Sequence, residues 1–151
     1  MRISRPAAAP YLMTRPSTAS NMYRAVTRKI EVSVTPRFLP ERSSETEGYY
    51  FWAYTIGIKN HGAETVQLKT RHWRITDGNG RLQEVRGAGV VGEEPVLKPG
   101  ESYEYTSGVP LQTSSGFMLG SYGMVSESGE QFDIEVPAFS LDAPASKRVL
   151  N

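Results

Sequence analysis

Hydrophobic and polar residues alternate with a period of two through most of this chain, a pattern that is typical of β-strands. The first alternation begins at Tyr23 and ends at Pro36, and it predicts one half-buried strand. A second begins at Tyr49 and continues to Lys59. Both of its faces are apolar at one end, which predicts a central strand of a sheet.

The next segment changes its pattern partway. Its apolar positions are first Val66 and Leu68, and then Trp73 and Ile75, which have the opposite parity. A change of parity within one strand indicates a β-bulge, which we place in the range 69–72. We also expect at least one of the two tryptophans, Trp52 and Trp73, to lie in the core because each has apolar neighbours two residues away.

Turn residues separate the remaining strands. The tetrapeptide Asp77-Gly78-Asn79-Gly80 supplies hairpin turn chemistry, and residues 82–85 form a short return strand. Strands also begin at Tyr103 and Phe117, and a last one over residues 132–136 is stopped by Pro137. Seven or eight short strands, with no sustained stripe of period 3.6, predict an all-β, antiparallel sandwich or barrel.

Composition limits the function classes. The 151 residues, 38% of them hydrophobic, suffice for one globular domain with a core. The chain has no cysteine, which excludes disulfides, thiolate zinc sites and a cysteine nucleophile. The lack of cysteine fits a reducing, cytoplasmic environment. The longest uncharged aromatic and apolar run, residues 49–58, is too short for a membrane helix of about 20 residues.

Residues 1–21 have neither helical nor strand periodicity, and they are rich in Ala, Pro, Ser, Thr and Arg. We expect them to be a disordered leader preceding a domain at residues 22–147. An acid-free leader of this kind resembles an organelle transit peptide. The interpretation that we favour is an upstream start codon, with Met22 as the native start.

Charge is distributed unevenly. Residues 1–30 carry six basic groups and no acidic one, whereas the remainder carries 11 basic and 16 acidic residues, a net charge of −5. A mildly acidic body argues against nucleic acid as the main partner. Five basic residues nevertheless cluster near the predicted bulge: Lys69, Arg71, Arg74, Arg81 and Arg86. They could attract an anion or form the solvated face of a hairpin.

The main candidate site is the glycine-rich loop that carries Gly87, Gly89 and Gly92, formally G-x-G-x-x-G. In a dinucleotide fold this pattern opens a helix that holds a pyrophosphate. Here Glu93-Glu94-Pro95 follows, which places two carboxylates beside the loop and no helix after it. We therefore interpret the glycines as serving backbone geometry in a ligand- or partner-binding loop.

Other chemistry is sparse. The only histidines, His61 and His72, match no metal-ligand spacing, and no serine lies in a G-x-S-x-G elbow. Glu93 and Glu94 are adjacent, so their carboxylates diverge. The sequence thus indicates no catalytic residue, no metal site and no cofactor.

Several motifs in order resemble the ApaG family. The longest runs from Val85 through Glu93-Glu94-Pro95 to Gly100. The other stretches that carry the resemblance are 54–60, 71–77, 103–108, 116–122 and 136–141. The resemblance as a whole covers essentially the range 22–141.

The resemblance implies an immunoglobulin- or fibronectin type III-like sandwich in a bacterial cytosolic protein that has been linked to cobalt and magnesium efflux. Eukaryotic relatives carry the domain inside larger proteins, where it resembles a binding module. We expect a non-enzymatic module that binds a protein partner or a second copy of itself. The alternative is a sensor for a phosphorylated nucleotide or a divalent metal.

Overall fold

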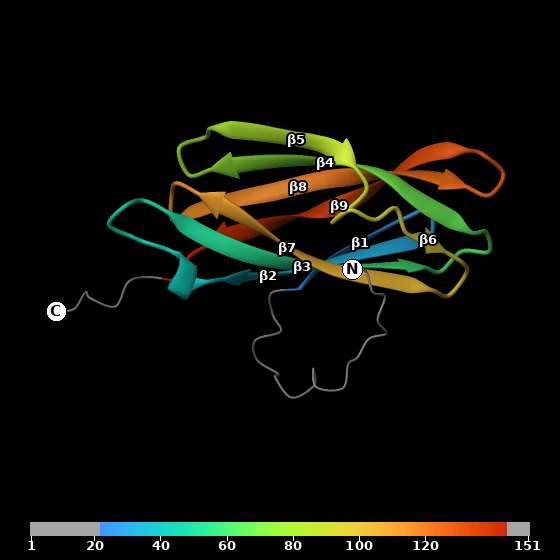
Figure 1. Ribbon diagram of the computed structural model, residues 1–151, viewed down its shortest axis with the longest axis horizontal. Helices are drawn as coiled ribbons and strands as arrows, with labels where there is room; N and C mark the ends of the chain where they lie inside the picture. Colours follow the sequence, from blue (N-terminus) through green and yellow to red (C-terminus); the bar gives the residue numbers. More distant parts are fainter. Residues whose placement is uncertain (1–21, 145–151) are drawn as a thin grey trace, which may run out of the picture.

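Two antiparallel sheets, packed face to face, account for the described part of this computed structural model, residues 22–144 (Figure 1). One sheet has the strand order β1-β2-β3-β7, and the other has the order β5-β4-β8-β9 with β6 also paired to β4. The predicted antiparallel sandwich is therefore confirmed. The predicted leader at 1–21 and residues 145–147 of the predicted domain lie outside the described residues.

The described residues form nine strands and one short 3₁₀ helix, η3 (Pro40–Arg42). The strands are β1 (Tyr23–Thr27), β2 (Ile30–Phe38), β3 (Tyr50–Asn60), β4 (Val66–Asp77), β5 (Leu82–Ala88), β6 (Val96–Leu97), β7 (Ser102–Leu111), β8 (Ser115–Ser126) and β9 (Gln131–Asp142). As predicted, β3 is central, since it pairs with β2 on one side and β7 on the other.

The prediction of a single strand from Tyr23 to Pro36 was wrong. The segment forms the hairpin β1–β2, whose turn residues Arg28 and Lys29 have φ angles of 51° and 67°. β2 also continues past Pro36 to Phe38. Pro36 lies beyond the last pair between the two strands, Tyr23 with Val34. On that side β2 has no neighbour in the sheet, so the missing proline amide costs no ladder bond.

Pro137 likewise does not stop a strand, because β9 runs through it to Asp142. β9 is an edge strand, and its pairing with β8 is irregular between Met118 and Gly120, close to the proline. The other sheet has a proline, Pro110, in its edge strand β7. Proline at these positions fits the rule that strand prolines occur at edges and bulges.

The bulge predicted in β4 is confirmed at the start of the expected range. The pairing of β4 with β8 shifts between Leu68 and Thr70, which leaves Lys69 as the extra residue. Both Leu68 before the shift and Trp73 after it are consequently buried in the core.

An aromatic cluster fills the middle of the sandwich. Trp73 is 4% exposed, and its ring meets those of Tyr54, Tyr122 and Phe139 at centroid distances of 5.4, 6.3 and 6.2 Å. Trp52 is buried as well, so both tryptophans lie inside. The hydroxyl groups of Tyr105 and Tyr122 share a hydrogen bond of 2.5 Å in this interior. Burial raises the pKa of both phenols.

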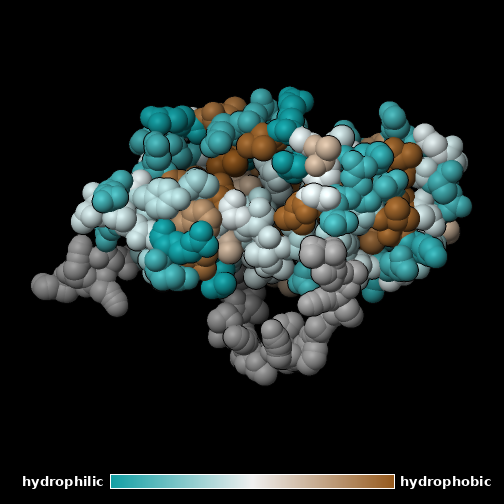
Figure 2. Space-filling view, viewed as in Figure 1, coloured by the Kyte–Doolittle hydropathy of each residue, from teal (hydrophilic) through white to brown (hydrophobic). Residues whose placement is uncertain are grey.

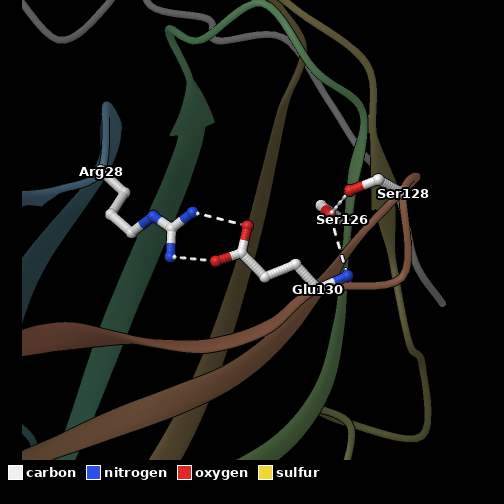
Figure 3. Close-up of polar contacts among 4 residues, drawn as sticks. All are labelled: Arg28, Ser126, Ser128 and Glu130. Atoms are coloured by element: carbon white, nitrogen blue, oxygen red, sulfur yellow. Dashed lines mark hydrogen bonds and ion pairs between the residues drawn. The ribbon is translucent and has the colours of Figure 1, made fainter.

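A salt bridge joins the two sheets at one end of the molecule (Figure 3). Arg28, in the β1–β2 turn, donates two hydrogen bonds of 3.1 and 3.0 Å to the Glu130 carboxylate, which precedes β9. The guanidinium also lies 4.2 Å from the centre of the Phe132 ring. On the other side, the Glu130 amide donates to the Ser126 hydroxyl. These contacts link the β1–β2 turn to the segment between β8 and β9.

We expect the pKa of Glu130 to lie below the ordinary glutamate value in the native protein. The cause is the hydrogen bond from Arg28, reinforced by the attraction of its charge. The resulting contribution to stability is present above the pKa of the unfolded chain and is lost as the pH falls through the native pKa. Carboxyl chemical shifts in an NMR titration should show this pKa rising in Arg28→Ala.

Arg28→Lys serves as the control for that titration, because it keeps the charge but loses the paired geometry. An intermediate pKa of Glu130 is expected in this variant. The same Glu130 pKa in the parent and in Arg28→Ala would contradict the assignment.

Candidate functional site

The glycine-rich segment forms the end of β5 and a tight turn after it. β5 continues to Ala88, so Gly87 lies in the strand and not in the loop where the sequence placed it. The chain then reverses through Val91 and Gly92, whose φ angles are 40° and 80°. The flanking residues exchange two main-chain bonds of 2.8 Å: Val90 and Glu93 each donate to the carbonyl of the other. Positive φ at both central residues is typical of a type I′ hairpin turn.

Gly89 lies at the start of this turn, and its φ is 63°. A β-carbon built there would be 2.4 Å from the carbonyl oxygen of Glu93, so no larger residue fits without movement of the backbone. Its amide donates to the carbonyl of Lys69, the bulged residue of β4, at 2.9 Å. Glycine is therefore needed at this position for two reasons. It adopts a positive φ without strain, and it has no β-carbon to block the close approach of the two backbone segments.

Arg71 on β4 holds the turn in place. Its Nη1 donates to the carbonyl oxygens of Ala88 and Gly89, both at 2.9 Å. A β-carbon on Gly87, directly opposite in the ladder, would lie 2.8 Å from the Arg71 guanidinium carbon. The absence of a side chain at Gly87 thus leaves room for the guanidinium to cross the strand. The sequence suggested a basic cluster here but not this role for Arg71.

The main-chain donors of the turn are largely engaged within the protein. The amides of Gly89, Val90 and Glu93 all donate to backbone carbonyls. A phosphate-binding loop needs such amides pointing at the ligand, and these three are not free for that purpose. The carboxylate of Glu94 lies beside the loop and forms an ion pair of 2.9 Å with Lys69.

One strained residue stands out in the turn. Val91 is β-branched and has positive φ, a conformation that such residues rarely adopt. The residue is also 51% exposed, so burial does not offset the strain. Strain of this kind is concentrated at functional sites. No signal in the sequence beyond the neighbouring glycines pointed to it.

Main-chain bonds at both ends of the β4–β5 ladder show which groups of β5 face away from β4. The Asp77 amide donates to the Arg81 carbonyl, and the Gly89 amide donates to the Lys69 carbonyl. Bonded pairs recur at every second residue of an antiparallel ladder. The residues that bond to β4 are therefore Gln83, Val85 and Gly87. Those whose amides and carbonyls point outward are Leu82, Glu84, Arg86 and Ala88.

We call this free side of residues 82–88 the β5 edge. It forms the outer rim of its sheet (Figure 1), and five of the seven residues are exposed. On the view in Figure 2, hydrophilic and hydrophobic residues are interspersed along this rim, without one continuous apolar patch. Among the outward-pointing groups, the Ala88 carbonyl already accepts a bond from Arg71.

The outer face of the β5 edge carries charges of both signs. Glu84 Oε2 lies 3.0 Å from His72 Nε2, 3.3 Å from Arg74 Nε and 3.8 Å from Arg86 Nη2. The hydrogen bond from His72, followed by that from Arg74, lowers the pKa of the Glu84 carboxyl. Three cationic or titratable groups thus surround one carboxylate, and Arg86, at 69% side-chain exposure, is the most accessible of them.

The predicted basic cluster is divided among separate contacts. Arg74 and Arg86 lie at Glu84, while Lys69 pairs with Glu94 and Arg71 turns to the loop carbonyls. Arg81 donates to the side chain of Gln112 at 3.1 Å. These side chains do not form one anion-binding patch.

The two histidines lie in separate places. His61 Nε2 is 2.7 Å from Glu31 Oε1, and His72 contacts Glu84. Within residues 22–144, no three His, Asp or Glu side chains gather as a set that could hold a metal ion. The same residues contain no helix with the length and apolar character needed to cross a membrane.

Comparison with known proteins gives the family. The ApaG domain model matches residues 40–126. A protein ApaG from a Bradyrhizobium species is 73% identical over 130 residues, which are 86% of this chain and all of the relative. A protein ApaG from Rhodopseudomonas palustris is 67% identical over the same shares of the two chains.

Solved structures share this fold. A crystal structure of an ApaA protein from Bordetella pertussis is 50% identical, with a TM-score of 0.75, and the match covers 78% of this chain and 95% of that one. The C-terminal domain of wzt, at 12% identity and a TM-score of 0.50, shares the fold alone; its match covers 87% of this chain and 81% of that domain. Since the family model spans more than half of the chain and whole relatives align at 67–73% identity, the chain belongs to the ApaG family.

Proposed function

We propose that this protein is a non-enzymatic binding module that recognises a protein partner by β-strand addition at the β5 edge. In this mode, the partner's strand bonds to the free amides and carbonyls of an edge strand. The supporting observation is that β5 is an exposed, seven-residue edge strand with neither a proline nor a bulge. Natural proteins usually protect such edges because they invite pairing with another chain.

The other sheet edges provide the contrast. β7 contains Pro110, β9 contains Pro137 beside an irregular pairing, and β1 is only five residues long. The prolines, the irregular pairing and the short length restrict strand addition at these three edges. The strained Val91 turn lies directly after β5, where it can contact whatever binds to that edge.

This proposal leaves the glycines in a supporting role. Gly87 leaves room for the Arg71 guanidinium, which bonds to the carbonyls of Ala88 and Gly89, and Gly89 allows the close approach of Glu93 in the turn. A phosphorylated ligand is less well supported, since the amides of the turn are bonded internally. Any contribution to cobalt or magnesium homeostasis would then be exerted through the partner protein.

Photo-crosslinking in living bacterial cells tests the proposal. A photoreactive amino acid replaces either Leu82, which is 57% exposed on β5, or Val26, which is 61% exposed on β1. We expect a protein adduct from position 82 that position 26 does not give. Adding Arg86→Pro should abolish it, because the Arg86 amide points outward and its loss removes a donor for the partner but no bond to β4. No adduct at position 82, or one that survives Arg86→Pro, would reject strand addition at this edge.

A further inference from the structure

The β5 edge is complementary to itself. We infer that the partner at this edge is a second copy of this chain, paired antiparallel about a twofold axis that passes through Val85. The inference rests on the proposed function and names its partner. In this pairing the two sheets continue as one, with Glu84 of each copy directly opposite Arg86 of the second copy.

The main-chain groups support this register. A twofold axis perpendicular to the sheet keeps each side chain on its own face. Residues whose amides and carbonyls point away from β4 must therefore pair with residues of the same kind in the second copy. With the axis at Val85, Glu84 pairs with Arg86 and Leu82 pairs with Ala88 of the second copy. Glu84 and Arg86 can then exchange both main-chain bonds with the second copy, as bonded pairs of an antiparallel ladder do. All seven residues of β5 take part.

The charges select the same register. Residues directly opposite each other on one face of an antiparallel pair are close enough to interact, and opposite charges there are favourable whereas like charges are not. Moving the axis by one residue in either direction places Glu84 opposite Glu84 or Arg86 opposite Arg86. Each of these alternatives also shortens the ladder. The arrangement centred on Val85 is therefore favoured by both its charge pairs and its length.

The small size of this interface predicts a weak association. A ladder of two seven-residue strands buries less than the roughly 1,200 Å² of a standard interface. Such small interfaces are typical of weak and transient complexes, so we expect a dissociation constant on the order of 10 µM. The exposed and mixed-charge side chains of this edge suit a complex whose subunits are also stable apart.

Analytical ultracentrifugation of the full chain at about 1–300 µM, a range around that constant, tests the inference. We expect the parent protein to dimerise with concentration. Glu84→Lys places two cations opposite each other, and Arg86→Glu places two carboxylates opposite each other, so each variant alone should remain monomeric. An equimolar mixture of the two variants should dimerise again. In the mixed pair the introduced lysine faces the introduced glutamate, and the unchanged Arg86 of one variant faces the unchanged Glu84 of the other.

Glu104→Lys on β7 is the matched control, since it makes the same change on an edge strand of the other sheet. It should dimerise like the parent, and near-UV circular dichroism should show that all variants are folded. A monomeric parent, equal dimerisation of the single variants, or a mixture that stays monomeric would each overturn the pairing. Crosslinking from Leu82 to a different protein, with a monomeric parent, would reject the second copy but keep strand addition.

Discussion

Replacing Trp73 by alanine should lower the free energy of unfolding by about 3–5 kcal/mol. The residue is 4% exposed and its ring contacts three other aromatic rings from both sheets, so truncation leaves a cavity in the core. Tyr54 and Phe139 would each lose an edge contact as well as buried area. Urea denaturation followed by tyrosine fluorescence or circular dichroism measures the loss.

Trp73→Phe is the control for this effect. It retains an aromatic ring in contact with Tyr54 and should cost clearly less than the alanine variant. It also remains measurable if Trp73→Ala does not fold at all. A loss of less than about 1 kcal/mol in Trp73→Ala would show that this cluster does not form the centre of the core.

Gly89→Ala should destabilise the protein by at least about 2 kcal/mol, more than other substitutions in the turn. Two causes act together: the left-handed conformation, at a φ of 63°, and a β-carbon 2.4 Å from the Glu93 carbonyl oxygen. Movement of that carbonyl disrupts the bond that it accepts from the Val90 amide, and movement of the Gly89 backbone disrupts the bond from the Gly89 amide to Lys69. Thermal and chemical denaturation would both report the loss.

Gly92→Ala separates the two causes. Gly92 also has positive φ, at 80°, but a β-carbon there would meet no atom within 4 Å. Its substitution should therefore cost only the conformational strain, about 1–2 kcal/mol. If Gly89→Ala and Gly92→Ala cost the same, the close approach of the backbone at Gly89 would contribute nothing to stability.

Hydrophobic alternation was sufficient to predict the sandwich, the central position of β3 and the bulge in β4. It failed at the β1–β2 turn because Arg28 and Lys29 adopt positive φ without the Gly or Asn that normally marks such a turn. It also failed at Pro36 and Pro137. Proline ends a strand only where its amide is needed by a neighbour, and the presence of a neighbour depends on the whole topology.

The site was predictable only in part. The glycines correctly indicated unusual backbone geometry at Gly89 and Gly92, since residues of positive φ favour glycine. The hydrogen bonds from Arg71 to the carbonyls of the turn could not be predicted from the sequence, because they require the register that places Arg71 opposite Gly87. The outward direction of the Glu84 and Arg86 amides depends on which residue pairs of the β4–β5 ladder are hydrogen-bonded. The local sequence does not determine this.

The strand order has a kinetic consequence. β3 pairs with β7 so that Tyr50 lies opposite Leu111, and β4 pairs with β8 across the intervening β5, β6 and β7. Long stretches of chain must therefore be closed before β3 can pair with β7 or β4 with β8, and the entropy of that closure is lost before the contacts repay it. Refolding from urea should accordingly take milliseconds to seconds, the range of all-β sandwiches, and not the microseconds of helical bundles.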